Sequence, residues 1–197
     1  DGSVAVADFD GDGMGEIVVS DAHGRLRLQD GNGDVLWRTT VYPGNLGKPT
    51  IADFDGDGEP EIAVSAAMLF SVVDGDGTIL WQTEIQDESS GFLTSSAFDF
   101  QADGAYEAIV ADQGNLWIFD GKTGEVIGSF DEHSSSTGAE FPVVADVDND
   151  GHAEIVMVSN NHAQFGSEKG VKVIGAAFDD WPPTSGVWNQ GEYVVTN

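Results

Sequence analysis

The 197-residue sequence contains no cysteine and only seven lysines and arginines, and both shortages narrow the possible functions. Without cysteine, the chain has neither a disulfide framework nor thiolate chemistry. Its 35 acidic residues give a formal charge of -28, which argues against nucleic acid or an anionic membrane as a partner. No apolar run approaches the roughly 18 residues of a membrane-spanning helix, so we expect no membrane insertion. Cations are the partners that this composition favours.

Helical periodicity is also missing, and the sequence instead repeats one unit four times. The phrase ADFDGDGMGEIVVS at 7–20 returns in related form at 52–65, 98–111 and 145–158. In each unit, short β-branched runs flank an acidic loop. In the first three units, Asp-Gly turns then join a second pair of runs, and their glycines supply the positive φ angles of tight hairpins. The fourth unit keeps VKVIG at 171–175 and then diverges.

Four antiparallel strands in about 45 residues are typical of one β-propeller blade. We therefore predict an all-β chain, a single β-propeller domain or propeller fragment (1–197) built from four-stranded antiparallel blades. The four blades would cover about 1–45, 46–91, 92–138 and 139–197. A β-sandwich is the competing all-β fold, but it gives no reason to repeat one loop chemistry at one spacing.

Each repeated loop is a nine-residue segment with oxygen-bearing side chains at positions 1, 3, 5 and 9 and glycine at position 6. Alternate side chains can converge from a tightly curved backbone, and the carbonyl of position 7 can add a further oxygen. Hard oxygen ligands in this number suit Ca²⁺ better than Mg²⁺ or Zn²⁺, so we predict up to four calcium sites. Their residues, with position 7 named last in each loop, are Asp8, Asp10, Asp12, Glu16 and Met14; Asp53, Asp55, Asp57, Glu61 and Glu59; Asp99, Gln101, Asp103, Glu107 and Ala105; and Asp146, Asp148, Asp150, Glu154 and His152.

The third loop has a neutral amide, Gln101, where the other loops have a carboxylate, so we expect it to bind calcium most weakly. An EF-hand or dockerin loop begins in a similar way but needs an acidic residue at position 12. This chain has Val19, Val64, Val110 and Met157 there, and a strand rather than a helix follows. The loops therefore belong to a β context.

The pattern ADFDGDGxxEI followed by a strand resembles the FG-GAP repeat of integrin-like propellers, which is similar to the VCBS-type repeats of bacterial surface proteins. The resemblance covers nearly the whole chain, and it implies a structural calcium loop between the innermost strand of a blade and the next strand. The ending WPPTSGVWNQGEYVVTN resembles the segment that closes such propellers in large secreted bacterial proteins. The Phe-Gly and Gly-Ala-Pro signatures of integrins are missing, so integrin-type ligand recognition is not implied.

These patterns favour a non-enzymatic, calcium-stabilised adhesion or ligand-binding scaffold that is secreted or displayed at the cell surface. Cytosolic free calcium could not fill weak sites of this kind, and the protein or glycan ligand cannot be read from the residues. The enzymatic alternative is a polysaccharide lyase of the rhamnogalacturonan type, which would need an acid and a base that no Lys, His or Tyr cluster supplies. A quinone-dependent dehydrogenase would need a larger ring. The four histidines share no spacing, and none is expected to be catalytic.

Trp37 and Trp81 occupy equivalent places at the ends of two hairpins, where we expect them, like Trp117, to pack between strands or blades. Trp181 and Trp188 could be a closing plug or an exposed contact. The chain begins at Asp1 rather than at methionine, so we expect a processed chain or a piece of a longer one, without a visible ring-closing strand exchange. Four blades could close alone, pair with a second copy, or belong to a larger ring, and an uncovered blade would expose apolar surface.

Overall fold

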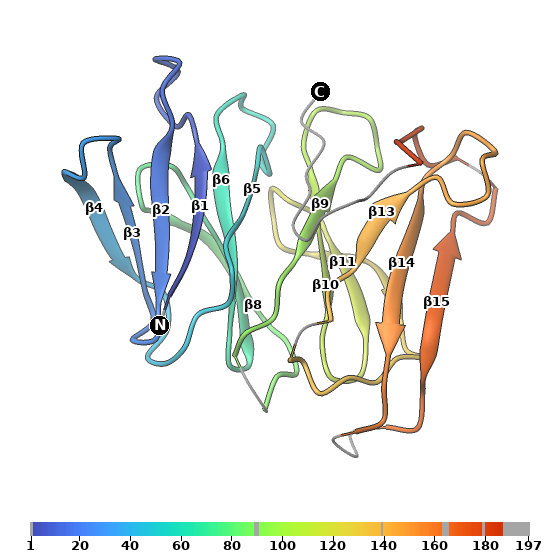
Figure 1. The fold of residues 1–197 in the computed structure, drawn as a ribbon. Helices are drawn as coiled ribbons and strands as arrows, with labels where there is room; N and C mark the ends of the chain where they lie inside the picture. Colours follow the sequence, from blue (N-terminus) through green and yellow to red (C-terminus); the bar gives the residue numbers. More distant parts are fainter. Residues whose placement is uncertain (1, 89–90, 139, 163–165, 179, 187–197) are drawn as a thin grey trace.

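The computed structural model describes residues 2–88, 91–138, 140–162, 166–178 and 180–186 (Figure 1). These residues form fifteen strands and no helix, which confirms the predicted all-β class. Four antiparallel sheets follow one another along the chain. Since no helix is present in this part of the chain, none is available to cross a membrane.

Each sheet is one blade, and its strands lie side by side in sequence order. Blade 1 contains β1 (Gly2–Ala7), β2 (Glu16–Asp21), β3 (Arg25–Gln29) and β4 (Val35–Thr40). Blade 2 contains β5 (Thr50–Ala52), β6 (Glu61–Ala66), β7 (Leu69–Val73) and β8 (Ile79–Glu84). Blade 3 contains β9 (Ser96–Phe98), β10 (Glu107–Ala111), β11 (Leu116–Phe119) and β12 (Val126–Phe130). Blade 4 contains β13 (Val143–Ala145), β14 (Glu154–Ser159) and β15 (Gly170–Gly175); residues 187–197 of its predicted range lie outside the described residues.

The outer hairpin of blades 1 and 2 is set by an Asp-Gly turn. The backbone N–H of Gly33 donates to the Asp30 carbonyl at 3.0 Å, and Gly77 repeats this contact with Asp74 at 2.8 Å. Both glycines have a positive φ, 92° and 89°, which L residues other than glycine rarely adopt. The same register irregularity precedes the turn in three blades, at Leu28/Gln29, Val72/Val73 and Ile118/Phe119.

The four blades form an open arc. Their innermost strands touch in order, β1 with β5, β5 with β9, and β9 with β13. No comparable contact joins β13 to β1 among the described residues, and Figure 1 shows blades 1 and 4 on opposite sides of the molecule. The fold is therefore that of consecutive propeller blades, without ring closure in this structure.

The hydrophobic core is divided into three clusters, one at each boundary between neighbouring blades. Between blades 2 and 3, Phe70, Trp81 and Phe119 pack with ring centroids 5.8 to 6.1 Å apart. The indole N–H of Trp81 donates to the carbonyl of Gly121 in the next blade at 2.6 Å. Burial of this much apolar surface at every boundary is the main force that holds the blades in order.

The other tryptophans follow the same logic. Trp37 donates from its indole N–H to the Gly75 carbonyl of blade 2 at 2.7 Å, so the predicted packing of Trp37 and Trp81 between blades is confirmed. Trp117 donates to the Asp112 carboxylate at 2.7 Å and lies on the ring of Phe119. The ring of Trp181 is 4.5 Å from that of Phe100, where it helps to cover the third core cluster. Trp188 lies outside the described residues.

Candidate metal centres

The four acidic loops occupy the same place in every blade. Each joins the innermost strand to the second strand, and its glutamate is the first residue of that second strand, opposite the last residue of the first. The pairs are Ala7 with Glu16, Ala52 with Glu61, Phe98 with Glu107, and Ala145 with Glu154. In Figure 1 the loops lie along the upper edge of the arc.

The glutamate anchors each loop from within the protein. All four glutamates are buried, and the Oε2 atom of each accepts a hydrogen bond from the backbone N–H of position 2. The donors and distances are Phe9 at 2.8 Å, Phe54 at 2.6 Å, Phe100 at 2.7 Å and Val147 at 2.9 Å. The three phenylalanines are themselves buried in the core, so both ends of these loops are fixed by packing.

The first aspartate of each loop shapes the turn. Asp53 accepts hydrogen bonds from the backbone N–H groups of Gly56 at 2.7 Å, Asp57 at 3.1 Å and Gly58 at 2.9 Å. Asp8 makes the equivalent three contacts at 2.8, 3.2 and 2.8 Å. These bonds hold the loop in a curved form in which carboxylate oxygens gather on its inner side.

Three loops bring carboxylates close together. One oxygen from each residue of a group lies within 4.8 Å of the others, and the groups are Asp53, Asp55, Asp57 and Glu61; Asp8, Asp10 and Glu16; and Asp146, Asp148 and Glu154. The predicted ligands Asp12 and Asp150, at position 5, are not in these groups. Like charges at this separation repel one another, and a divalent cation would remove that repulsion.

The buried atoms of the fourth loop fit a cation. The Oδ1 atom of Asp146 is buried and has no hydrogen-bond partner among the described residues. An unpaired buried carboxylate oxygen is costly unless it is compensated, and coordination of a metal ion is one way to compensate it. The donor set is carboxylate oxygen throughout, which suits calcium chemistry. The residues present therefore fit the predicted ion.

Protonation competes with the cation at these sites. Burial raises the pKa of Glu61 to about 8, and the hydrogen bonds from Phe54 and Asp55 oppose this shift. The charges of Asp55 and Asp53 add to it. Burial likewise raises the pKa of Glu107 to about 7. A bound cation would favour the ionised carboxylate and displace the proton, because metal ligands must be deprotonated.

The third loop is built differently. In the described residues, the carboxylates of Asp99, Asp103 and Glu107 do not form a group with oxygens within 4.8 Å of one another, as the carboxylates of the other loops do. Gln101 turns its amide nitrogen toward Glu107 and donates to Oε1 at 3.3 Å. The ammonium group of Lys122 lies 3.7 Å from a carboxylate oxygen of Asp103. Gln101 gives this loop one negative charge fewer than the other loops, as predicted. Lys122 places a positive charge beside it, and the spacing of the sequence did not indicate this contact.

Position 7 contributes its backbone. The N–H groups of Met14, Glu59, Ala105 and His152 each donate to the position-5 aspartate of their loop at 2.7 to 3.0 Å. The His152 ring points elsewhere, with Nδ1 3.0 Å from the Trp181 carbonyl. That the position-7 carbonyls coordinate the ion remains a prediction.

Position 4 has a requirement that the sequence pattern did not reveal. It adopts a left-handed backbone in every loop, with φ of 73° at Gly11, 76° at Gly56, 54° at Ala102 and 64° at Asn149. Glycine adopts this conformation freely and asparagine tolerates it, whereas alanine is strained there. The third loop therefore carries backbone strain in addition to its missing carboxylate.

Four consecutive antiparallel sheets, each with an acidic loop between its first two strands, define a repeat protein of the β-propeller class. The sequence profile of the FG-GAP-like repeat matches residues 8–64 and 99–157, which together are more than half of the chain. The chain belongs to the FG-GAP-like repeat family, as its sequence indicated.

Known structures support the fold at low sequence identity. The chain resembles the crystal structure of the V. cholerae biofilm matrix protein Bap1 with a TM-score of 0.79 and 16% identity, over 95% of this chain and 58% of that one. The C-terminal domain of Pseudomonas aeruginosa PilY1 matches with a TM-score of 0.56 and 20% identity, over 81% of this chain and 44% of that one. An Agrocybe aegerita lectin specific for non-reducing terminal N-acetylglucosamine matches with a TM-score of 0.53 and 17% identity, over 93% of this chain and 51% of that one. The chain thus spans about half the length of these proteins, and no curated protein sequence matches it significantly.

Proposed function

We propose that this chain is a calcium-stabilised, non-enzymatic propeller module that serves as an adhesion or ligand-binding scaffold outside the cell. The observation that carries the proposal is the gathering of carboxylates at the same place in blades 1, 2 and 4. A cation at this place would join the two innermost strands of a blade through the buried glutamate and the aspartates of the loop. Its role would be to hold the blade together.

The magnitude of this effect is large on the scale of domain stability. A site that binds calcium at ten times its dissociation constant gains about 1.4 kcal/mol, so three sites would add about 4 kcal/mol. Typical domains unfold with a total of about 5 to 15 kcal/mol. Sites of moderate affinity would fill in the millimolar calcium outside cells and stay empty in the cytosol, which supports an extracellular location.

The relatives in fold are compatible with this role. Bap1 is a biofilm matrix protein, and the Agrocybe aegerita protein is a lectin, so similar propellers occur in proteins of a matrix or a glycan-binding kind. These likenesses support a scaffold that presents a binding surface. The ligand on this chain, a protein or a glycan, would be sought with a glycan array and with extracellular matrix proteins.

The deciding experiment is thermal unfolding in calcium, in magnesium and in chelator. We expect calcium to raise the melting temperature by roughly 10 °C, at about 2 to 4 °C per kcal/mol, and magnesium to do much less. Asp55→Asn should remove part of the increase because Asp55 belongs to the four-carboxylate group. Asp34→Asn, in an exposed hairpin of blade 1, is the matched control and should keep the full calcium-induced increase in melting temperature.

Two results would reject the proposal. Superimposable melting curves in calcium and chelator would remove the structural role of the ion. Depolymerisation of pectin-like polymers by the purified chain would replace the non-enzymatic scaffold with a polysaccharide lyase.

A further inference from the structure

Each blade has two faces that pack in a fixed order. The leading face points toward the preceding blade, and the trailing face points toward the following blade. At the boundary between blades 1 and 2, the leading-face residues Ile62 and Val64 are at most 1% exposed, and so are the trailing-face residues Val18 and Leu26. The same face-to-face order recurs at the other two boundaries. A leading face is thus covered by a trailing face three times in this molecule.

The leading face of blade 1 has no such cover among the described residues. Val4 and Val6 of β1 are 63% and 64% exposed, and Ile17 and Val19 lie opposite them on β2. Ile17 and Val19 occupy the places of Ile62 and Val64 in blade 2, but they are only half-buried. The apolar side chains of a blade boundary are therefore present on this face.

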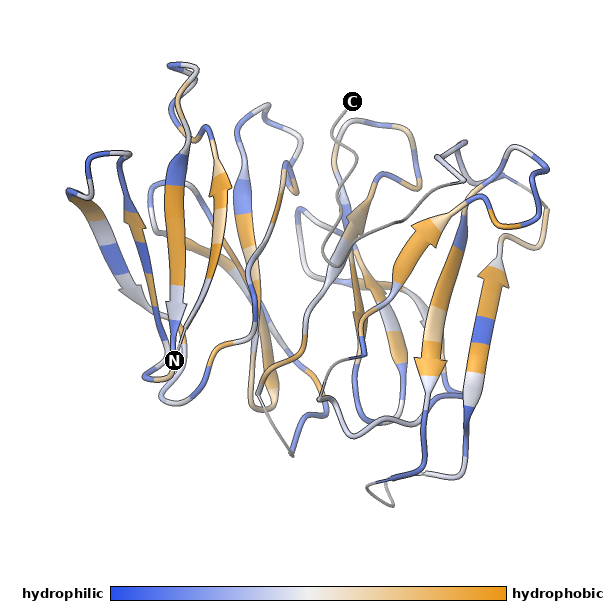
Figure 2. Cartoon of the chain, in the orientation of Figure 1, coloured by the Kyte–Doolittle hydropathy of each residue, from blue (hydrophilic) through white to orange (hydrophobic). Residues whose placement is uncertain are grey.

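The trailing face of blade 4 is open in the same way. Val158, Val171 and Val173 are 48%, 67% and 54% exposed, and they lie together because Val158 pairs with Val171 in the β14–β15 register. In blade 1, the residues equivalent to Val158 and Val171 are Ser20 and Leu26, and both are fully buried. Figure 2 shows β14 and β15 as largely hydrophobic strands at this end of the arc.

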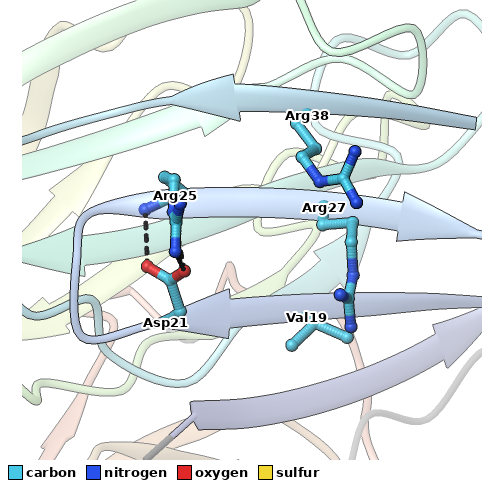
Figure 3. A pocket seen from close by; sticks show the side chains of 5 residues that line it. All are labelled: Val19, Asp21, Arg25, Arg27 and Arg38. Carbon is cyan, nitrogen blue, oxygen red and sulfur yellow. Dashed lines mark hydrogen bonds and ion pairs between the residues drawn. The ribbon is translucent and has the colours of Figure 1, made fainter. Parts of the chain in front are cut away.

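The outer half of the open leading face carries three of the chain's seven basic residues. Arg25, Arg27 and Arg38 line a hollow of about 300 Å³ together with Val19 and Asp21 (Figure 3). Arg25 is paired with Asp21 at 2.7 Å. Arg27 has a buried Nε without a hydrogen-bond partner, and neither Arg27 nor Arg38 has a carboxylate partner in the described part of the chain.

The equivalent positions in blade 2 indicate what these arginines would meet. Ser71 stands at the place of Arg27 and is fully buried, and Gln82 stands at the place of Arg38. The Gln82 amide donates across the blade boundary to the Val41 carbonyl of blade 1 at 3.3 Å. The position of Arg38 is therefore one from which a side chain reaches the backbone just after the outer strand of a covering blade and donates to it.

We propose that the leading face of blade 1 binds the trailing face of blade 4 in a second copy of this chain. Within the described residues, the chain presents one open face of each kind, and the kinds are those that pack against each other at every internal boundary. Two such contacts, related by a two-fold axis, would close two arcs into one ring of eight blades. Arg27 and Arg38 would supply hydrogen-bond donors to acceptors of the second copy, and their positive charge would offset part of the repulsion between two chains that each carry a net charge of -28. The inference rests on the blade faces and is independent of the proposed role of calcium.

The test is the solution mass of residues 1–197 in saturating calcium, measured by analytical ultracentrifugation over a wide range of protein concentrations. We expect a species of twice the 20.8 kDa chain mass. Arg27→Glu with Arg38→Glu should shift it to the monomer, and so should Val171→Asp with Val173→Asp. Ile127→Asp is the matched control, because Ile127 is similarly exposed at 47% but lies on β12, the outer strand of blade 3, away from the two end faces.

Mixing the two double variants separates this arrangement from other pairings. The arginine variant keeps an intact trailing face and the valine variant keeps an intact leading face, so a mixture should recover one contact and associate more weakly than the wild type. If leading faces paired with each other, the valine variant alone would remain a dimer, and the proposal would fail. A wild-type chain that stays monomeric at every concentration would also overturn the proposal. The open faces would then have to be covered by blades of a different sequence. Melting curves of each variant confirm that it is folded.

Discussion

Gln101 offers the sharpest test of the metal loops, because replacing it by aspartate should lower stability in chelator and enlarge the stabilisation that calcium provides. Gln101→Asp restores the carboxylate that the other three loops have at position 3. In chelator, the variant loses the 3.3 Å hydrogen bond from Gln101 to Glu107 and adds a fourth negative charge beside Asp99 and Asp103. This loop is largely exposed to solvent, so the combined cost should be modest, about 1 to 2 kcal/mol.

In calcium, the same change should add a competent site. At ten times the dissociation constant, that site contributes about 1.4 kcal/mol, with a further gain from the repulsion that the ion removes. For a chain of this size, we expect the melting temperature to fall by about 2 to 8 °C in chelator and the calcium-induced increase to grow by a similar amount. The pH should be kept well above the wild-type Glu107 pKa of about 7, because the added carboxylate raises this pKa further in the variant.

The assay combines scanning calorimetry with isothermal titration of calcium. Gln101→Asn is the matched control: it shortens the side chain and weakens the contact with Glu107, but adds no charge. It should lower stability slightly in chelator and leave the number of bound ions unchanged. If Gln101→Asp binds no additional calcium, or if it is as stable as the wild type in chelator, then the reasoning about charge in this loop is wrong.

Three further predictions address other parts of the structure. Ala102→Gly should raise the free energy of unfolding by about 1 kcal/mol in calcium-free buffer, because Ala102 has a φ of 54°; no gain in chemical denaturation would contradict the strain argument. Trp81→Phe should cost about 1 to 3 kcal/mol in the same assay, since it leaves the Gly121 carbonyl without its 2.6 Å partner. Burial lowers the pKa of His133 from 6.5, so the folded protein binds fewer protons than the unfolded chain below that pH. The contribution of His133 to stability should therefore fall as the pH drops through about 6.5, whereas the raised pKa values of Glu61 and Glu107 act in the opposite direction. The effect is read from the difference between the pH profiles of the wild type and His133→Asn.

The repeated unit and its loop could be predicted because both depend on local chemistry. The spacing of Asp8, Asp10 and Glu16 predicted a compact loop between two strands, and alternation with Asp-Gly turns predicted the outer hairpins. The structure places these elements as expected. The prediction that the Gln101 loop binds calcium most weakly came from counting charges.

The features that could not be predicted from the sequence depend mainly on contacts between distant segments. Lys122 lies beside Asp103 only because the β11–β12 turn folds toward the neighbouring loop. The strain at Ala102 could not be predicted from Gly11 and Gly56 at the same position, because glycine there does not by itself indicate that a positive φ is required. Alternation along β3 puts Arg25 and Arg27 on one face, but which blade face is left open is a property of the whole arc.

The interchangeability of leading and trailing faces has an evolutionary consequence. Every boundary uses the same kind of apolar contact, and at two of them an indole of one blade donates to a glycine carbonyl of the next. Gain or loss of a whole repeat of about 45 residues would therefore join compatible surfaces again, with no need to redesign either neighbour. Such a chain can change its number of blades by duplication or deletion in its gene, while the curvature of each pair of blades limits which totals form a complete circle.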